Sequence, residues 1–168
     1  MPSVRCARAE ARLWPAAMAS SHPRSLRRSA ARLAAVQALY QREMEEVPLA
    51  ALLAEFHEHR LGATIEGASY ARASVAVFDD IVAGVDARCG ELDALIAGLL
   101  VPGWSLDRLD KLMKAMLRAA AYELAHRPDL PTGSVIGDYV EVARAFYDKR
   151  EVGFVHGLLD ALAKEVRT

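Results

Sequence analysis

The chain has 168 residues, of which 53% are hydrophobic and 26% charged, a composition typical of a folded domain and not of a disordered chain. Its two cysteines, Cys6 and Cys89, exclude a disulfide scaffold and a cysteine-based zinc finger, and they fit the reducing cytoplasm. The longest stretch without a charged residue, 94–106, is too short to cross a bilayer and contains Pro102 and Gly103, which excludes a transmembrane helix.

The formal net charge of -1 conceals an uneven distribution of charge along the chain. Residues 1–34 contain seven arginines, no lysine and one glutamate, a net charge of +6, while the remaining residues carry a net charge of -7. Clustered arginines neutralise phosphates and release counterions, so a basic segment on an acidic body predicts a polyanionic partner. The alternative left open by charge alone is a solubilising basic tail.

Residues 1–23 show no apolar periodicity and contain three prolines. We predict that this segment is a disordered extension, or upstream sequence ahead of a true start at Met18. Its composition also resembles a transit peptide, an interpretation that we favour less. The folded domain is therefore expected to span residues 24–168.

Beyond this segment, apolar residues recur at helical spacing almost to the end of the chain. No alternating run of β-branched residues predicts a strand. The sequence predicts an all-α single domain of about seven helices, packed largely antiparallel. Helices are expected over 25–46, 48–60, 68–98, 110–126, 133–147 and 151–166, with a short helical turn from 105. Ser25 is expected to cap the first of these helices and Thr132 the helix over 133–147.

Four arginines gather in the opening turns of the first predicted helix: Arg24, Arg27, Arg28 and Arg32. Positive charge at a helix N-terminus opposes the helix dipole, so these residues do not serve the helix itself. Arg28 and Arg32 lie four residues apart and share a face, which fixes charge on a rigid element. The pattern therefore predicts a surface that binds a nucleic-acid backbone.

Other chemistries find no support in the sequence. His57 and His59 are two residues apart, so on a helix they point away from each other and do not share a metal ion. No glycine-rich loop follows a strand, no nucleophile elbow occurs, and Cys89 lies on a predicted apolar face. We expect no enzymatic activity, no cofactor and no metal.

Several short motifs, in order and at consistent spacing, resemble the NusB family of bacterial transcription antitermination factors. The resemblance covers about residues 24–166. It rests on RRSAAR and AVQALY at 27–32 and 35–40, Phe78, AGV at 83–85, LD at 92–93, LR and YEL at 117–118 and 122–124, Ile136, Glu141, Ala143, Phe146, and FVHGLLD at 154–160.

The resemblance implies an all-helical protein without enzymatic activity that binds the boxA element of nascent ribosomal RNA transcripts. It implies that binding occurs together with NusE, which is also a small-subunit ribosomal protein. The complex would join RNA polymerase with other Nus factors and suppress premature termination. A homodimer is left open.

The same resemblance assigns RNA-binding residues. The arginine-rich N-terminal region of the family maps onto Arg28 and Arg32 by position and onto Arg27 by proximity, and Arg24 belongs to the same cluster. The loop before the last helix and the phenylalanine that opens that helix map onto Lys149, Arg150 and Phe154, although Phe154 could equally be core. The chain departs from the family at Gly153, His156 and the Gly137-Asp138 pair, where Lys, Asn and Asn-Glu are usual.

A helix over 110–126 is the predicted NusE interface. It carries Lys111, Lys114 and Arg118 on one side at spacings of three and four, with Met113 expected to be exposed nearby. The alternative is plain solvation of the outer face of a core helix.

Two further interpretations remain open at this level. One is the NusB-like domain of a ribosomal RNA methyltransferase, which requires a large catalytic domain after the helical one. The other is a helical adaptor that binds protein through its acidic body and does not bind RNA.

Overall fold

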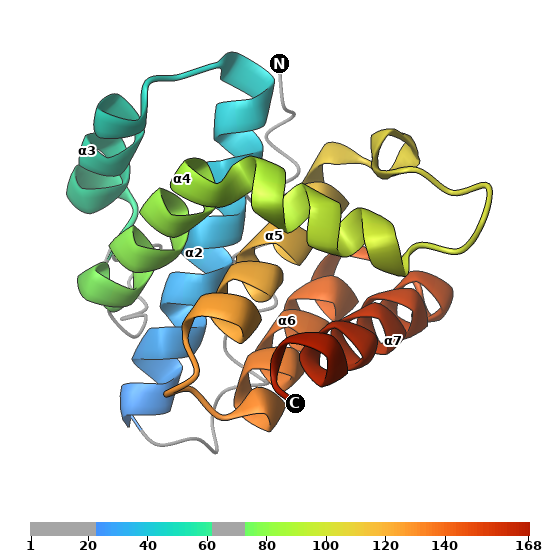
Figure 1. Cartoon of the computed structure of the whole chain (residues 1–168). Coiled ribbons are helices and arrows are strands. Elements are labelled where there is room, and N and C mark those ends of the chain that lie inside the picture. The colour runs from blue at the N-terminus through green and yellow to red at the C-terminus, as the bar shows by residue number, and fades with distance from the viewer. Residues whose placement is uncertain (1–22, 62–72) are drawn as a thin grey trace.

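The computed structural model describes residues 23–61 and 73–168, and every regular element within these ranges is helical (Figure 1). This confirms the predicted all-α class. The elements are α2 (Pro23–Glu45), α3 (Leu49–His59), α4 (Val75–Leu99), the 3-10 turn η1 (Leu106–Arg108), α5 (Lys111–His126), α6 (Thr132–Phe146) and α7 (Lys149–Val166). Nearly all of the predicted N-terminal extension, and the predicted start of the third helix at 68, lie outside the described residues.

Helix α5 forms the centre of the bundle. Ten of its 16 residues are buried, on all sides of the helix, which requires neighbours all round. Figure 1 shows it between α2 and α4 on one side and α6 and α7 on the other. Its alanines Ala115, Ala119, Ala120 and Ala121 are at most 1% exposed, and such small side chains allow neighbouring helices to approach closely.

The starts of several helices differ from those predicted. Ser74 accepts a hydrogen bond from the Val77 N–H and caps α4, so residues 73 and 74 lie outside the helix that was predicted over 68–98. Helix α2 begins at Pro23, a residue suited to the first turn of a helix, so Ser25 lies inside the helix and does not cap it. Thr132 does not cap α6 either, because it is the first residue of the helix and Pro131 holds the cap position. Its Oγ1 accepts a hydrogen bond from Arg167 Nη1 at 3.0 Å. Helix α7 begins two residues early, at Lys149.

Two of the three glycines of α4, Gly84 and Gly90, have different roles. Gly84 packs directly on α5, where a Cβ atom would lie 2.2 Å from Cζ of Tyr122. Gly90 has open space around it but follows a bend at Arg88, whose backbone leaves helical geometry (φ -123°, ψ 20°). Close packing and a bend therefore occur at different places in α4.

Arg167, which follows the last residue of α7, links this end of the helix to the end of α5 and to the segment between α5 and α6. Its guanidinium donates to the carbonyl oxygens of Glu123, Leu124, Arg127 and Leu130 at 2.5–3.1 Å. These carbonyls lie at and after the end of α5, where the last turn lacks partners within the helix. No helix in the described ranges is both long and apolar enough to cross a membrane.

Candidate nucleic-acid interface

Arg32 is not on the surface, contrary to the sequence prediction. It is 1% exposed and is the largest of the fully buried side chains in the described residues. Its Nε and Nη2 donate to the two carboxylate oxygens of Glu123 on α5, at 2.8 and 3.2 Å. Its Nη1 donates to Asp138 on α6 at 2.6 Å. With all three nitrogens bound inside the protein, Arg32 joins three helices and presents no donor to RNA.

The partners of Arg32 form a closed hydrogen-bond network. Tyr139 donates its hydroxyl to Glu123 at 2.7 Å, and Ser29 donates to Asp138 at 2.7 Å. Burial disfavours the charged form of Arg32, but the hydrogen bond and charge of Glu123 outweigh it and raise the pKa of Arg32 above its ordinary value. Burial, followed by the charge of Glu123, raises the pKa of Tyr139 well above its ordinary value.

A sequence signal for this burial exists. Arg32 lies four residues before Val36 and seven before Leu39, which places it on the apolar face of α2 rather than the polar one. A long charged residue within an apolar stripe requires a buried counter-charge. Glu123, surrounded by apolar residues in α5, is that counter-charge. In the sequence-based prediction, Arg32 instead belongs to a surface and Glu123 has no partner in the arginine cluster.

The other three arginines of the cluster remain near the surface at the start of α2. Arg24 and Arg27 are exposed and Arg28 is half-buried. A hydrogen bond from Arg127 lowers the pKa of Asp129, and the charge of Arg28 contributes a little. Ser29, next to Arg28, donates to Asp138 of α6, so the start of α2 lies beside the N-terminal half of α6.

Lys149, Arg150 and Phe154 lie at the start of α7. Lys149 and Arg150 are exposed, but they belong to the first turn of the helix and not to the preceding loop as predicted. Phe154 is half-buried and packs against the core, and its outer side contacts the ring of Trp104. Phe154 is therefore partly core, and its role in RNA binding stays a prediction.

The structure separates these two sets of basic residues. The arginines of α2 lie beside the N-terminal half of α6, and Lys149 and Arg150 follow the C-terminal end of α6. The full length of this 15-residue helix is about 22 Å. Figure 1 shows the first turn of α2 (blue) at the lower left, and the segment 101–110 (yellow), which contacts the start of α7, on the right. The predicted RNA site is therefore two separate basic groups.

The predicted partner face of α5 is only partly exposed. Lys111 is exposed, but Met113 is 3% exposed and belongs to the core, so the expectation of an exposed methionine is wrong. Met113 lies three and four residues before Met116 and Leu117, so it shares their buried face of α5. Lys114 reaches Glu43 of α2 at 2.9 Å.

Arg118 links α5 to both α2 and α4. Its Nε and Nη2 donate to Asp93 at 2.7 and 2.9 Å, and its Nη1 donates to Glu43 at 3.0 Å. The hydrogen bond to Asp93 is the main reason that the pKa of Arg118 is raised. The lysine and arginine of this face therefore stabilise helix packing through internal ion pairs, with Lys111 remaining as the outward charge.

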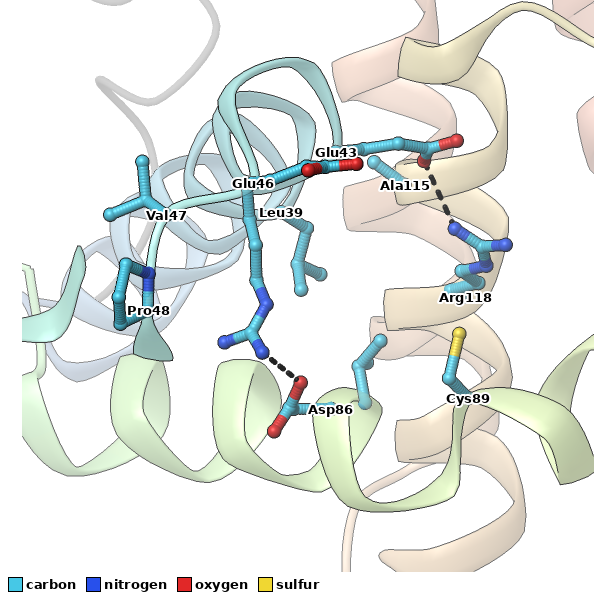
Figure 2. Close-up of a pocket in the computed structure, with 11 residues that line it drawn as sticks. Leu39, Glu43, Glu46, Val47, Pro48, Asp86, Cys89, Ala115 and Arg118 are labelled. Carbon is cyan, nitrogen blue, oxygen red and sulfur yellow. Dashed lines mark hydrogen bonds and ion pairs between the residues drawn. The ribbon is translucent and has the colours of Figure 1, made fainter. Parts of the chain in front are cut away.

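A cavity of about 410 Å³ lies beside Arg118, between the end of α2, the bend of α4 and α5 (Figure 2). It is lined by Leu39, Arg42, Glu43, Glu46, Val47, Pro48, Val85, Asp86, Cys89, Ala115 and Arg118. Figure 2 shows Glu43 pointing toward Arg118, with Cys89 below them. Burial raises the pKa of the Cys89 thiol, against the opposing charge of Arg118, so this thiol is a poor nucleophile.

Histidines and carboxylates do not converge in the described ranges: no group of three or more His, Cys, Asp or Glu is placed to hold a metal ion. His57 bonds Asp79 at 2.6 Å, and His59 lies 3.6 Å from Glu58.

Comparison with known proteins gives a consistent set of relatives. A sequence model of the NusB family matches residues 29–164. The transcription antitermination protein NusB of Sphingopyxis alaskensis is 60% identical over 144 residues, which are 86% of this chain and 97% of the relative. That of Novosphingobium aromaticivorans is 61% identical over 140 residues, 83% of this chain and 95% of the relative. Neither relative has room for the large additional domain of a methyltransferase.

Solved structures agree in fold. T. maritima NusB superposes with a TM-score of 0.67 at 28% identity, covering 84% of this chain and 93% of that one. A chain from a crystal structure of the antitermination factors NusB and NusE in complex with double-stranded RNA gives a TM-score of 0.68 at 24% identity, covering 82% and 96%. The second match is evidence of a shared fold alone.

Proposed function

The chain belongs to the NusB family, and we propose that it is a cytoplasmic transcription antitermination factor that binds boxA RNA of nascent ribosomal transcripts together with NusE. In this function it joins RNA polymerase with other Nus factors and suppresses premature termination. No enzymatic step is involved.

The identity of 60% over almost the whole length of a NusB relative carries this proposal. The structure supports it through the exposed arginines at the start of α2, which suit phosphate binding. The internal network of Arg32 holds this end of α2 against α5 and α6. Arg32 is therefore a positioning residue for the basic surface, while Arg24, Arg27 and Arg28 are its RNA-contacting members.

The acidic body explains why a second protein takes part. Outside residues 1–34 the chain has a net charge of -7, which repels a polyanion at low salt. A few phosphate contacts from one helix end give mostly sequence-independent binding. We infer that NusE extends the basic surface and supplies part of the sequence selectivity.

The RNA surface is tested by the double variant Arg27→Ala, Arg28→Ala. Its binding to boxA RNA and to a scrambled RNA is measured by filter binding across a salt series, with and without NusE. We expect weaker binding, and a log-log salt slope lower by about one unit for each lost phosphate contact.

The matched control is Arg144→Ala, which removes an exposed arginine of α6 that belongs to neither basic group. Arg32→Ala is unsuitable as a test of RNA contact, because it leaves Glu123 buried and unpaired. Unchanged affinity and slope in the double variant would disprove the RNA role of α2. Equal binding of boxA and scrambled RNA by the wild-type protein with NusE would favour the adaptor interpretation.

For the protein partner, Lys111 is the remaining outward charge on the N-terminal part of α5. We infer that it lies in the NusE interface, and that Lys114 and Arg118 support that face through Glu43 and Asp93. Lys111→Glu should weaken NusE binding in a titration while leaving the melting temperature unchanged. Reversal at Lys114 is a poorer test, since it sets a carboxylate against Glu43.

A further inference from the structure

Two of the most exposed apolar side chains of the described residues lie in the segment between α4 and η1. Val101 is 60% exposed and Trp104 is 54% exposed. Trp104 did not belong to any predicted site. Burial of the exposed half of the indole against a partner would remove a large apolar surface from water, which is favourable. Its exposure therefore indicates a binding surface.

The backbone holds Trp104 in a fixed place. Val101, Pro102, Gly103 and Trp104 form a closed turn in which the Trp104 N–H donates to the Val101 carbonyl at 3.0 Å. Proline in the second position and glycine at φ +89° in the third are the residues that a type II turn requires. Arg108 Nη1 also donates to the Gly103 carbonyl at 3.3 Å, which ties the turn to η1.

One side of the indole stacks on Phe154 of α7. The ring centroids are 6.4 Å apart and the planes are inclined by 29°. Phe154 itself packs against the core, so it supports the indole from below. On α7, Gly153 and Gly157 adjoin Phe154, and a Cβ atom at either would meet nothing within 4 Å. The exposed side of the aromatic pair is therefore open to a flat ligand.

Cationic side chains lie beside this pair. Arg150 precedes Phe154 by four residues and so shares its face of α7, and Arg108 is bonded to the turn that carries Trp104. Lys149 is also exposed, and the acidic residues of the same two segments are Asp107, Asp110, Asp148 and Glu151. The net charge of this surface is therefore not positive, and it is the guanidinium groups beside an exposed aromatic pair that suit a ligand with flat rings and phosphates.

We propose that Trp104 is a stacking platform for a base of single-stranded RNA, with Arg150 and Arg108 contacting the adjacent phosphates. Unpaired bases present a flat face to aromatic side chains, and guanidinium groups bind the backbone beside them. The inference rests on the proposed function and deepens it, since it gives the α7 group a second aromatic residue and a defined mode of contact.

The fluorescence of Trp104 tests the contact directly. The chain has two tryptophans, so the Trp14→Phe variant leaves Trp104 as the single indole. This variant is titrated with a short single-stranded RNA carrying boxA, with NusE present, and separately with NusE alone. We expect quenching on addition of RNA, because a stacked base quenches indole emission, and little change with NusE alone.

Binding measurements on three variants accompany the titration. Trp104→Leu keeps the apolar contact with Phe154 but removes the flat ring, and we expect RNA affinity to fall about 5-fold to 100-fold. Trp104→Tyr keeps an aromatic ring and should bind close to wild type. Met44→Ala, which removes an exposed apolar side chain at the end of α2, is the matched control and should have no effect. Circular dichroism melts show whether each variant is folded.

The outcomes separate this inference from the proposed function. Should the wild-type protein bind boxA RNA while Trp104→Leu binds equally well and Trp104 emission stays constant, the platform is wrong and the proposed function stands. A change in emission with NusE alone, and none with RNA, would make this surface a protein contact and overturn the platform. Absence of RNA binding by the wild-type protein, with and without NusE, would overturn both.

Discussion

Two ion-pair networks join α5 to its neighbours, and they differ chiefly in burial. The buried network consists of Arg32, Glu123, Asp138, Tyr139 and Ser29, and the rim network consists of Arg118, Asp93, Glu43 and Lys114. The side chains of Arg32 and Glu123 are 2% and 1% exposed. Those of Arg118 and Asp93 are 16% and 28% exposed.

This contrast shows how the same pair of residue types has different consequences in different places. In the buried network, each charge has lost its water and depends on its partner, so loss of one leaves the other unpaired in a medium of low polarity. In the rim network, the charged groups are partly exposed, so water can solvate a group that has lost its partner. The buried network therefore fixes the arrangement of α2, α5 and α6, while the rim network adjusts the packing of α2 and α4 on α5.

The largest effect is expected from Arg32→Met. This change leaves the buried carboxylate of Glu123 without its counter-charge, and we expect the free energy of unfolding to fall by about 3–5 kcal/mol. Urea denaturation measures it. The double variant Arg32→Met, Glu123→Leu removes both charges and should be more stable than Arg32→Met alone. A loss in Arg32→Met no larger than that in Arg118→Met would contradict the comparison.

A smaller loss is expected from Arg118→Met. Its pairs lie between the exposed and the buried cases, so the free energy of unfolding should fall by about 1–2 kcal/mol. High salt should reduce the loss of unfolding free energy caused by Arg118→Met, because salt screens partly exposed ion pairs. The same salt series on Arg32→Met should show little change, and equal salt sensitivity in both variants would argue against the difference in burial.

The pH dependence of stability tests Tyr139 in the buried network. Its pKa in the folded protein is raised above the ordinary value of about 10, mainly by burial and then by Glu123. The folded state therefore keeps a proton that the unfolded state releases, and this contribution is present below about pH 10 and is lost as the pH rises further. Stability should decline less steeply above pH 10 in Tyr139→Phe, by up to about 1.4 kcal/mol per pH unit. Parallel declines would show that Tyr139 titrates normally.

The smallest effect is expected at the edge of the rim network. Lys114→Met removes one ion pair to Glu43, which keeps Arg118 as a partner, so the loss should stay below about 1 kcal/mol. Lys111→Met removes an exposed charge and should leave the melting temperature unchanged. Thermal melts of the two variants side by side check this order, and a larger loss in Lys111→Met would reverse it.

Much of the fold was predictable because helical periodicity is local. The sequence predicts a helix over 110–126, and Asp110 caps it by accepting a hydrogen bond from the Met113 N–H at 2.9 Å. The contact of Gly84 with Tyr122 was not predictable in this way, because the two residues lie 38 positions apart. Capping by Thr132 was wrong because Thr132 is itself the first residue of α6, and its hydroxyl accepts a hydrogen bond from the distant Arg167.

The candidate site was less predictable for the same reason. An arginine near a helix start is compatible with RNA binding or with an internal ion pair, and only the position of Glu123 on another helix decides between them. The departure at Gly137-Asp138 illustrates this, since Asp138 keeps a carboxylate where the family usually has Glu, and that carboxylate accepts the hydrogen bond from Arg32. Trp104 was not singled out, because its exposure depends on where α7 places Phe154.

By itself, the sequence determined the helical class, most helix boundaries, the family and the basic start of the first described helix. These depend on residue order and on spacings within a few turns. Only the tertiary structure decided which charges face water: it buried Arg32 and Met113, engaged Lys114 and Arg118, and separated the basic residues of α2 from those of α7. The physical reason is that the free energy of a charged side chain depends on its solvent exposure and on partners distant in sequence, which local spacing does not specify.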